Sequence, residues 1–168
     1  MRASRGSFTR ERVLAILESV KDPEVPVVSV VELGIVRHVA VEGTRITITI
    51  TPTYSGCPAM REIEQDIRAA LGAEGMDDVA LETVHAPAWT TDWIGAEARE
   101  KLRRYGIAPP GAAEHGGLVA IARRRVAAVC PRCGSNNTEL QSEFGSTACK
   151  AIHVCRACGE PFDEFKAF

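Results

Sequence analysis

The sequence lacks several features that would place it in a large functional class. No apolar run approaches the ~20 residues that a membrane-spanning helix needs. There is no G-x-G-x-x-G motif for a dinucleotide, and the paired Glu-x-x-His helices of a di-iron bundle are missing. The net charge of -2 provides no overall basic field that would favour nucleic-acid binding. Any specific chemistry must therefore lie in local motifs.

The N-terminus and the cysteines indicate the cellular compartment. The N-terminal segment, MRASRGSFTRER, is basic, but no apolar signal-peptide segment follows it, so we expect a cytoplasmic protein. Four of the six cysteines form two CxxC pairs. In a cytosolic chain such pairs favour a metal site over disulfides.

One stretch, Thr51 to Met60 (TPTYSGCPAM), places a lone cysteine where a strand gives way to a helix. Arg45 to Thr51 alternates isoleucine with threonine, which predicts a strand. From Ala59 to Leu71, apolar residues recur at the spacing of an amphipathic helix. Pro58 suits the first helical position, so Cys57 is the predicted N-cap, close to unpaired backbone N–H groups.

Two interpretations of Cys57 are open on spacing alone. A helix N-terminus favours the thiolate, and with it a reactive or metal-binding role. A small buried thiol is the alternative, because free cysteines are among the most buried residues. Gly56 favours reactivity, since a glycine lets backbone or a partner approach closely.

Around this junction we expect a small α+β domain with the order helix, strand, strand, helix, strand, helix. Thr9 or Ser7 would cap the first helix, and Gly106 would end the last. Two prolines make Asp22 to Pro26 an extended loop. The further predicted elements are a helix over Arg10 to Val20, a strand over Ile35 to Val41, a hairpin turn over Glu42 to Thr44, a strand over Val79 to Val84 and a helix over Asp92 to Tyr105.

The best domain boundary lies in residues 107 to 117 (IAPPGAAEHGG), which concentrate proline, glycine and alanine without periodicity. We therefore predict a first domain over residues 1 to 106, a linker over 107 to 117, and a second domain over 118 to 168.

The second domain carries the most specific chemical signal, CPRCG followed by CRACG. Its four predicted metal ligands are Cys130, Cys133, Cys155 and Cys158. The spacer between the pairs has about the length of a β-hairpin, which is typical of a zinc ribbon. Four thiolates leave no open coordination position, so a structural Zn²⁺ is expected. Rubredoxin-like iron is the rival, disfavoured by the lack of tryptophan and tyrosine in this part of the chain.

Cys149, in EFGSTACKA, lies outside the two pairs. A buried or incidental thiol is the favoured interpretation. The alternative is that Cys149 and Cys57 are both exposed soft ligands that pass iron or a cluster between proteins. His153 is expected as a strand side chain rather than a ligand. Trp89 and Trp93 are expected in the core, and Arg123 to Arg125 on a solvated strand surface.

Two sets of motifs resemble known families. DPEVPVVSVVELGIV (Asp22 to Val36) followed by TPTYSGCP (Thr51 to Pro58) resembles the iron–sulfur assembly family that includes SufT and eukaryotic cytosolic cluster-targeting factors. HAPAWTTDWI (His85 to Ile94) and the tail motifs CPRCGS, EFGSTACKA and CGEPFDEFK are similar to the PaaD family, also called PaaJ, of phenylacetyl-CoA epoxidase accessory subunits. The second resemblance spans nearly the whole chain.

The resemblance implies a non-enzymatic maturation factor for the ring-oxygenating epoxidase complex of phenylacetate degradation. It would assist the assembly of an iron–sulfur or iron centre in a client subunit, with Cys57 as the transient ligand. Asp22 and Glu24 would accept hydrogen bonds from the helix terminus at Cys57 or from a partner, and Thr51 would hydrogen-bond the sulfur. For the acidic loop, a turn-forming Asp-Pro with a solvated glutamate is the alternative.

The implied partners are the oxygenase or reductase subunits of the epoxidase and the iron–sulfur assembly machinery, with no membrane partner. A homodimer in which two Cys57 residues face each other is a further alternative. One competing function is a zinc-ribbon adaptor for protein or nucleic acid with no metal transfer, disfavoured by the charge and the few exposed aromatics. Thiol enzyme chemistry at Cys57 ranks last, because it needs a base such as His38 or His85 nearby.

Overall fold

The chain folds into two compact units of mixed α and β structure, as the sequence predicts. The computed structural model describes residues 8–111 and 127–167. The units are Met1–Trp89 and Thr90–Phe168. Over the described ranges, no helix is long and apolar enough to cross a membrane.

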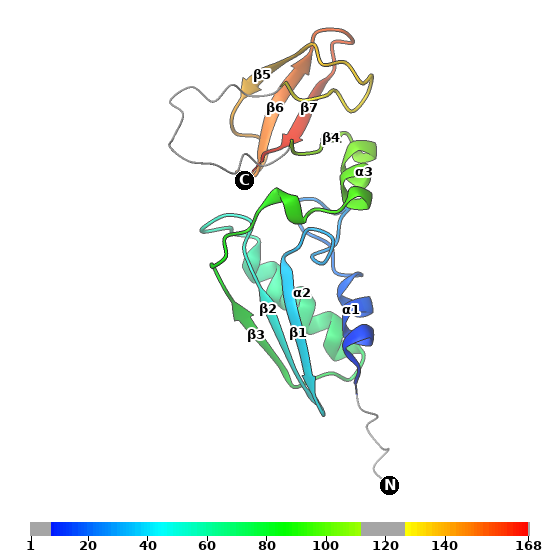
Figure 1. Cartoon of the computed structure of the whole chain (residues 1–168), viewed down its shortest axis with the longest axis vertical. Coiled ribbons are helices and arrows are strands. Elements are labelled where there is room, and N and C mark those ends of the chain that lie inside the picture. Colours follow the sequence, from blue (N-terminus) through cyan, green and yellow to red (C-terminus); the bar gives the residue numbers. More distant parts are fainter. Residues whose placement is uncertain (1–7, 112–126, 168) are drawn as a thin grey trace. The chain divides into compact units, whose positions relative to one another are not determined.

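The N-terminal unit is built on strand β2 (Arg45–Ile50), which lies at the centre of a three-stranded sheet (Figure 1). Strand β1 (Val36–Glu42) pairs with it in antiparallel fashion through a tight turn at Gly43, whose φ of +64° suits glycine. Strand β3 (Val79–Thr83) pairs with it in parallel. A parallel neighbour requires a crossover, which helix α2 (Met60–Ala73) supplies.

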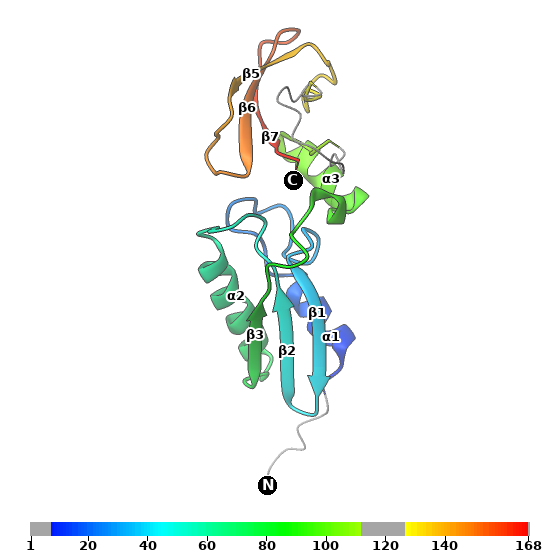
Figure 2. The ribbon, with the colours of Figure 1, turned by 60° about the vertical axis from the view of Figure 1, so that its left-hand side comes forward.

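Helices α1 (Arg10–Leu17) and α2 cover one face of this sheet, as both ribbon views show (Figure 2). The alternation predicted for β2 is confirmed, since its three isoleucines are fully buried. Each such side chain contributes about 1.5–3 kcal/mol through its removal from water. The fully buried partners on the helices are Val13, Leu17, Ile63, Ile67 and Leu71.

Helix α1 begins where the sequence predicts but ends earlier. The Thr9 hydroxyl accepts the Arg12 backbone N–H at 3.2 Å, which confirms Thr9 as the N-cap. The helix stops at Leu17 rather than at Val20. The Val20 N–H bonds instead to the Leu17 carbonyl at 3.1 Å, in a tighter turn that leads into the proline-bracketed loop.

Trp89 is a core residue of the N-terminal unit, as predicted. Only 5% of its surface is exposed, and its indole N–H donates to the backbone carbonyl of Leu33 at 2.8 Å. A buried carbonyl needs such a partner. Trp93, by contrast, is half-buried.

The C-terminal unit holds a four-stranded sheet in the order β4-β7-β6-β5. Strands β5 (Thr138–Ser142), β6 (Lys150–Cys155) and β7 (Pro161–Phe165) form an antiparallel meander. Strand β4 (Ile107–Ala108) pairs in parallel with β7. This sheet includes the β-hairpin expected between the two cysteine pairs.

The helix predicted over Asp92 to Tyr105 is interrupted. A short 3₁₀ helix, η1 (Thr91–Trp93), precedes α3 (Ala96–Tyr105), and Ile94 between them has extended backbone with ψ of 113°. The Arg99 side chain donates to the carbonyls of Thr91 and Ile94, which stabilises the break. Gly106, with φ of +95°, ends α3 as predicted.

The domain limits also differ from those expected. The compact units divide between Trp89 and Thr90, so α3 belongs to the C-terminal unit rather than to the first domain. Residues 107 and 108, expected to begin the linker, form β4 because they pair with Asp163 and Glu164. Residues 112–126, which include most of the expected linker and Arg123 to Arg125, lie outside the described structure.

Replacing the Trp89 indole tests its role in the core. Trp89→Phe keeps an aromatic ring but leaves the Leu33 carbonyl without its donor, so we expect the free energy of unfolding to fall by about 1–3 kcal/mol. Urea denaturation followed by circular dichroism measures the change. Tyr105→Phe, which removes one hydroxyl from a side chain that is 56% exposed, is the matched control. Equal unfolding midpoints for the two variants would contradict the assignment.

Candidate functional site

Cys57 lies before the helix rather than at its N-cap. Helix α2 begins at Met60, and its N-cap, Ala59, makes no side-chain capping bond. The Cys57 N–H donates to the Tyr54 carbonyl at 3.3 Å, and its own carbonyl accepts the Met60 N–H at 3.4 Å. The predicted N-cap role of Cys57 and the predicted first helical position of Pro58 are therefore wrong.

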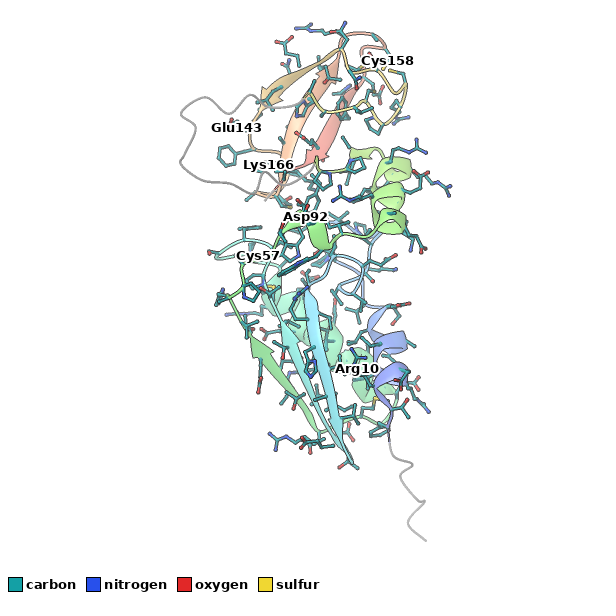
Figure 3. All side chains as sticks on the ribbon, in the orientation of Figure 1. Arg10, Cys57, Asp92, Glu143, Cys158 and Lys166 are labelled. Atoms are coloured by element: carbon teal, nitrogen blue, oxygen red, sulfur yellow. The ribbon has the colours of Figure 1, made fainter. Side chains whose placement is uncertain are left out.

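The Cys57 side chain is nevertheless accessible. It is half-buried in the turn that follows β2, at the end of the sheet where Figure 3 labels it. The preceding Gly56 has a φ of +80°, which favours glycine, and apart from its two neighbours in the chain no described residue has an atom within 4 Å of the position a Cβ would take there. The turn thus leaves open space beside a reachable sulfur.

Asp22 shapes the acidic loop from within. Its side chain is only 6% exposed, and its Oδ1 accepts the backbone N–H groups of Glu24 and Val25, each at 2.8 Å. This is the turn-forming arrangement that the Asp-Pro sequence allowed as an alternative. Glu24 is half-buried on the same loop.

Thr51 contributes a buried hydroxyl at the end of β2. Its backbone N–H donates to the Ile35 carbonyl at 2.9 Å, and the residue is 1% exposed. Its Oγ1 has no hydrogen-bond partner in the part of the chain that the structure describes, so the hydrogen bond expected between Thr51 and the Cys57 sulfur is not formed. A buried polar atom without a partner is uncommon in a folded protein.

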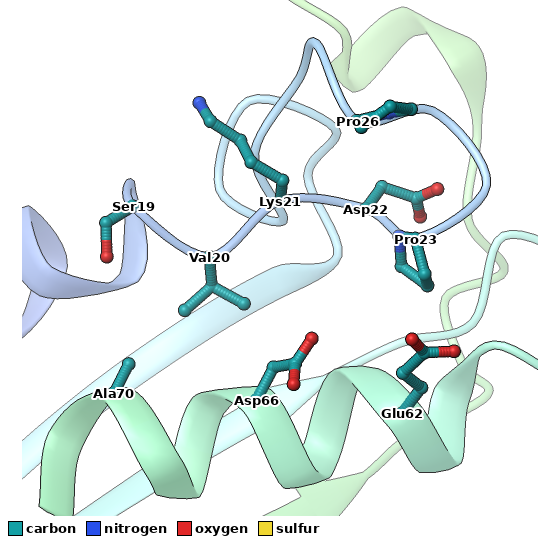
Figure 4. A pocket seen from close by; sticks show the side chains of 9 residues that line it. All are labelled: Ser19, Val20, Lys21, Asp22, Pro23, Pro26, Glu62, Asp66 and Ala70. Atoms are coloured by element: carbon teal, nitrogen blue, oxygen red, sulfur yellow. The ribbon is translucent and has the colours of Figure 1, made fainter.

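A shallow groove separates the acidic loop from helix α2 (Figure 4). Three carboxylates face it, those of Asp22, Glu62 and Asp66, and Cys57 does not line it. The sequence analysis did not predict that Glu62 and Asp66 of α2 lie across a groove from the acidic loop. Their i, i+4 spacing was the available signal. The other lining residues are Ser19, Val20, Lys21, Pro23, Pro26 and Ala70.

The four paired cysteines converge in the C-terminal unit. Their sulfur atoms all lie within 4.8 Å of one another. The sulfurs of Cys130 and Cys158 are 3.8 Å apart, and those of Cys133 and Cys155 are 3.5 Å apart. A tetrahedral zinc ion with Zn–S bonds of about 2.3 Å needs sulfurs separated by about 3.8 Å. The donor set and its size therefore fit zinc.

The surrounding backbone polarises these thiols unequally. The backbone N–H groups of Cys158 and Ala157 point at the Cys155 sulfur and lower the pKa of Cys155 to about 7. For Cys133, the Ser135 N–H also stabilises the thiolate, but the neighbouring thiols of Cys155 and Cys158 outweigh it and raise the pKa to about 12. Four thiolates so close together require a cation between them.

The remaining candidates lie outside this sulfur cluster. Cys149 is 3% exposed, with its sulfur 3.1 Å from the Thr147 hydroxyl, so the idea of an exposed soft ligand there is wrong. His153 is a buried side chain of β6 whose Nε2 lies 2.7 Å from a Glu164 carboxylate oxygen. His38 and His85 are exposed, and Cys57 hydrogen-bonds neither of them within the described ranges.

Two family models match consecutive parts of the chain. Residues 10–83 match an iron-sulfur cluster assembly protein family, and residues 117–166 match the PaaD zinc beta ribbon domain. The second match covers all four clustered cysteines, so this part of the chain is a zinc ribbon. A crystal structure of a domain of unknown function, DUF59, from Bacillus anthracis is 32% identical with a TM-score of 0.51. The alignment covers 55% of this chain and 89% of that one.

Curated relatives extend the likeness. An Fe-S protein maturation auxiliary factor of Porphyromonas gingivalis is 33% identical, over 56% of this chain and 90% of its own. A protein of Escherichia coli strain K12, named as a subunit of a "Putative 1,2-phenylacetyl-CoA epoxidase", is 48% identical over 92% of this chain and 90% of its own. The chain therefore belongs to the PaaD family of phenylacetyl-CoA epoxidase subunits, which joins an iron–sulfur assembly domain to a zinc ribbon.

Proposed function

We propose that this protein is an accessory factor that assists the assembly of an iron–sulfur or iron centre in another subunit of a phenylacetyl-CoA epoxidase complex. The observation that carries the proposal is the accessible thiol of Cys57, in the turn that follows β2 within the region matched to iron–sulfur assembly proteins. Iron or a cluster is the cargo here, and Cys57 is its transient ligand.

The clustered cysteines and Cys57 have different roles in this proposal. The clustered thiols of the ribbon, at Cys130, Cys133, Cys155 and Cys158, hold a structural Zn²⁺ and leave no open coordination position. Cys57 offers a single soft ligand on an accessible turn. One ligand releases its cargo more readily than four, which suits transfer between proteins.

The proposed supporting residues lie on the acidic loop and at the end of β2. Asp22 fixes the acidic loop through its two backbone hydrogen bonds, and Glu24 presents a second carboxylate from that loop to a partner. The Thr51 hydroxyl is buried at the end of β2, so it would meet a ligand atom of the cargo only when the turn around Cys57 opens.

The role proposed for Cys57 is one without catalysis. An activated thiol nucleophile needs a base within hydrogen-bond reach of its sulfur. In the described structure, Cys57 makes its hydrogen bonds to Tyr54 and Met60 through its backbone N–H and carbonyl. The relative from Porphyromonas gingivalis is named as a maturation auxiliary factor, which supports this role.

Replacing the Cys57 sulfur tests whether this thiol is needed for iron delivery, without disturbing the fold. Cys57→Ser changes one half-buried atom, so we expect a folded protein with its zinc retained. Epoxidase subunits produced beside this variant should carry no more iron than subunits produced without the protein. Iron content by elemental analysis, together with epoxidase activity of the purified complex, measures the effect.

Ser55→Ala is the matched control, because it alters an exposed side chain of the same turn. It should restore iron loading to the wild-type level. Full loading of the epoxidase subunits by Cys57→Ser would refute the assignment of Cys57 and leave an adaptor that guides its client by surface contacts alone.

Removing the zinc tests its structural role. Two of the four cysteines, Cys130 and Cys155, belong to a buried cluster with Ala108, Ala128 and Phe162, so loss of the metal should loosen this core. After chelation, verified by elemental analysis, we expect backbone amides of β5, β6 and β7 to lose protection from hydrogen exchange. The amides of β1, β2 and β3 serve as the internal control. Unchanged protection in β6 would contradict a structural metal.

A further inference from the structure

The loop between β5 and β6 presents an exposed aromatic ring. Phe144 is 68% exposed, although a phenylalanine ring is costly to leave in water. A single exposed apolar residue is ordinary on a protein surface. The hydrogen bonds that hold this loop, however, and the lysine over the ring are more than an incidental surface residue requires.

The backbone on both sides of Phe144 is fixed by hydrogen bonds. The Ser142 hydroxyl donates to the Phe144 carbonyl at 2.8 Å and lies 3.2 Å from the Phe144 N–H. The Gly145 N–H donates to the Lys150 carbonyl at 2.8 Å. A Cβ at Gly145 would lie 3.2 Å from the Lys150 Cβ, so the loop packs closely against β6. The ring is therefore held on a rigid support.

A lysine completes the arrangement. The Lys166 ammonium lies 5.0 Å from the centre of the Phe144 ring and donates to the Glu143 carbonyl at 3.1 Å. A cation over a ring face is a favourable contact. Lys166 forms no ion pair within the described ranges, so its charge is not neutralised there by a carboxylate of this chain.

This surface lies at the opposite end of the ribbon from the sulfur cluster. The pairing of Lys150 with Phe165 marks the loop end of the sheet, and Val154 pairs with Pro161 at the other end, next to Cys155. Figure 3 labels Glu143 and Lys166 at one end and Cys158 at the other. A partner can therefore bind at the loop without touching the metal.

We propose that Phe144 and Lys166 form a docking element for a partner protein, whose complementary site is an apolar pocket bordered by carboxylates. The ring would fill the pocket, and the ammonium would pair with the carboxylates at its rim. Because the loop is already rigid, little conformational entropy is lost on binding, as in other aromatic anchors. The choice of partner rests on the proposed function: it is the epoxidase complex assembled from its other subunits.

The test is a direct binding measurement between the zinc-loaded, full-length protein and the purified epoxidase complex that lacks this subunit. Biolayer interferometry compares wild type with Phe144→Ala, Lys166→Met and Tyr105→Ala. We expect Phe144→Ala to weaken binding by at least about tenfold. Lys166→Met should reduce the dependence of affinity on salt, since it removes one charge contact. Tyr105→Ala, which truncates another exposed aromatic, should bind like wild type.

The outcomes separate the docking element from the function. If Phe144→Ala binds as tightly as wild type, the docking element is refuted, while wild-type binding leaves the proposed function standing. If wild type itself does not bind the complex at micromolar concentration, the docking element is also refuted. The function is then decided separately by iron loading in the presence of Cys57→Ser. Unchanged zinc content and thermal unfolding of Phe144→Ala exclude a folding defect as the cause of weakened binding.

Discussion

The parallel pairing of β2 with β3 is the constraint on which the N-terminal unit depends. Antiparallel strands can be joined by a short turn, but parallel neighbours need a crossover long enough to return the chain to the same end of the sheet. Helix α2 makes that return, so the segment from Thr51 to Ala59 must leave the sheet at the end of β2. The position of Cys57 at this edge follows from the topology. Its exposure follows from the open turn at Gly56.

The C-terminal unit combines apolar packing with a metal site. Its buried cluster contains two cysteines beside two alanines and one phenylalanine. A metal ion held by the four thiolates fixes the two CxxC turns at one end of the sheet and adds its binding free energy to that of packing. All four clustered thiols are ligands of this ion, so none of them remains for another metal. In the proposed function, binding of an exchangeable cargo by a soft ligand therefore falls to Cys57 of the other unit.

Sequence patterns predicted the features that depend on near neighbours along the chain. Ile–Thr alternation predicted β2, and CxxC spacing predicted the sulfur cluster. The predictions were wrong where contacts between residues far apart in the sequence determine the local structure. Ile107 becomes a strand because it pairs with Asp163, and the helix before it is broken because the Arg99 guanidinium binds the carbonyls around Ile94. In the sequence Phe144 resembles any loop residue, and only the fold brings Lys166, from another strand end, over its ring.

A single thiol sets a limit on what the N-terminal unit can do by itself. Iron and iron–sulfur clusters are commonly held by four protein ligands, and in the described ranges the ribbon cysteines form the one cluster of three or more potential ligands close enough to share an ion. If Cys57 binds the cargo as proposed, it supplies one ligand. The protein that gives the cargo, the protein that receives it or a second copy of this chain must then supply the others. Cargo bound in this way is shared during an encounter rather than stored. A factor of this kind depends on recognising its partner, which gives a physical reason to expect a rigid docking element elsewhere on the same chain.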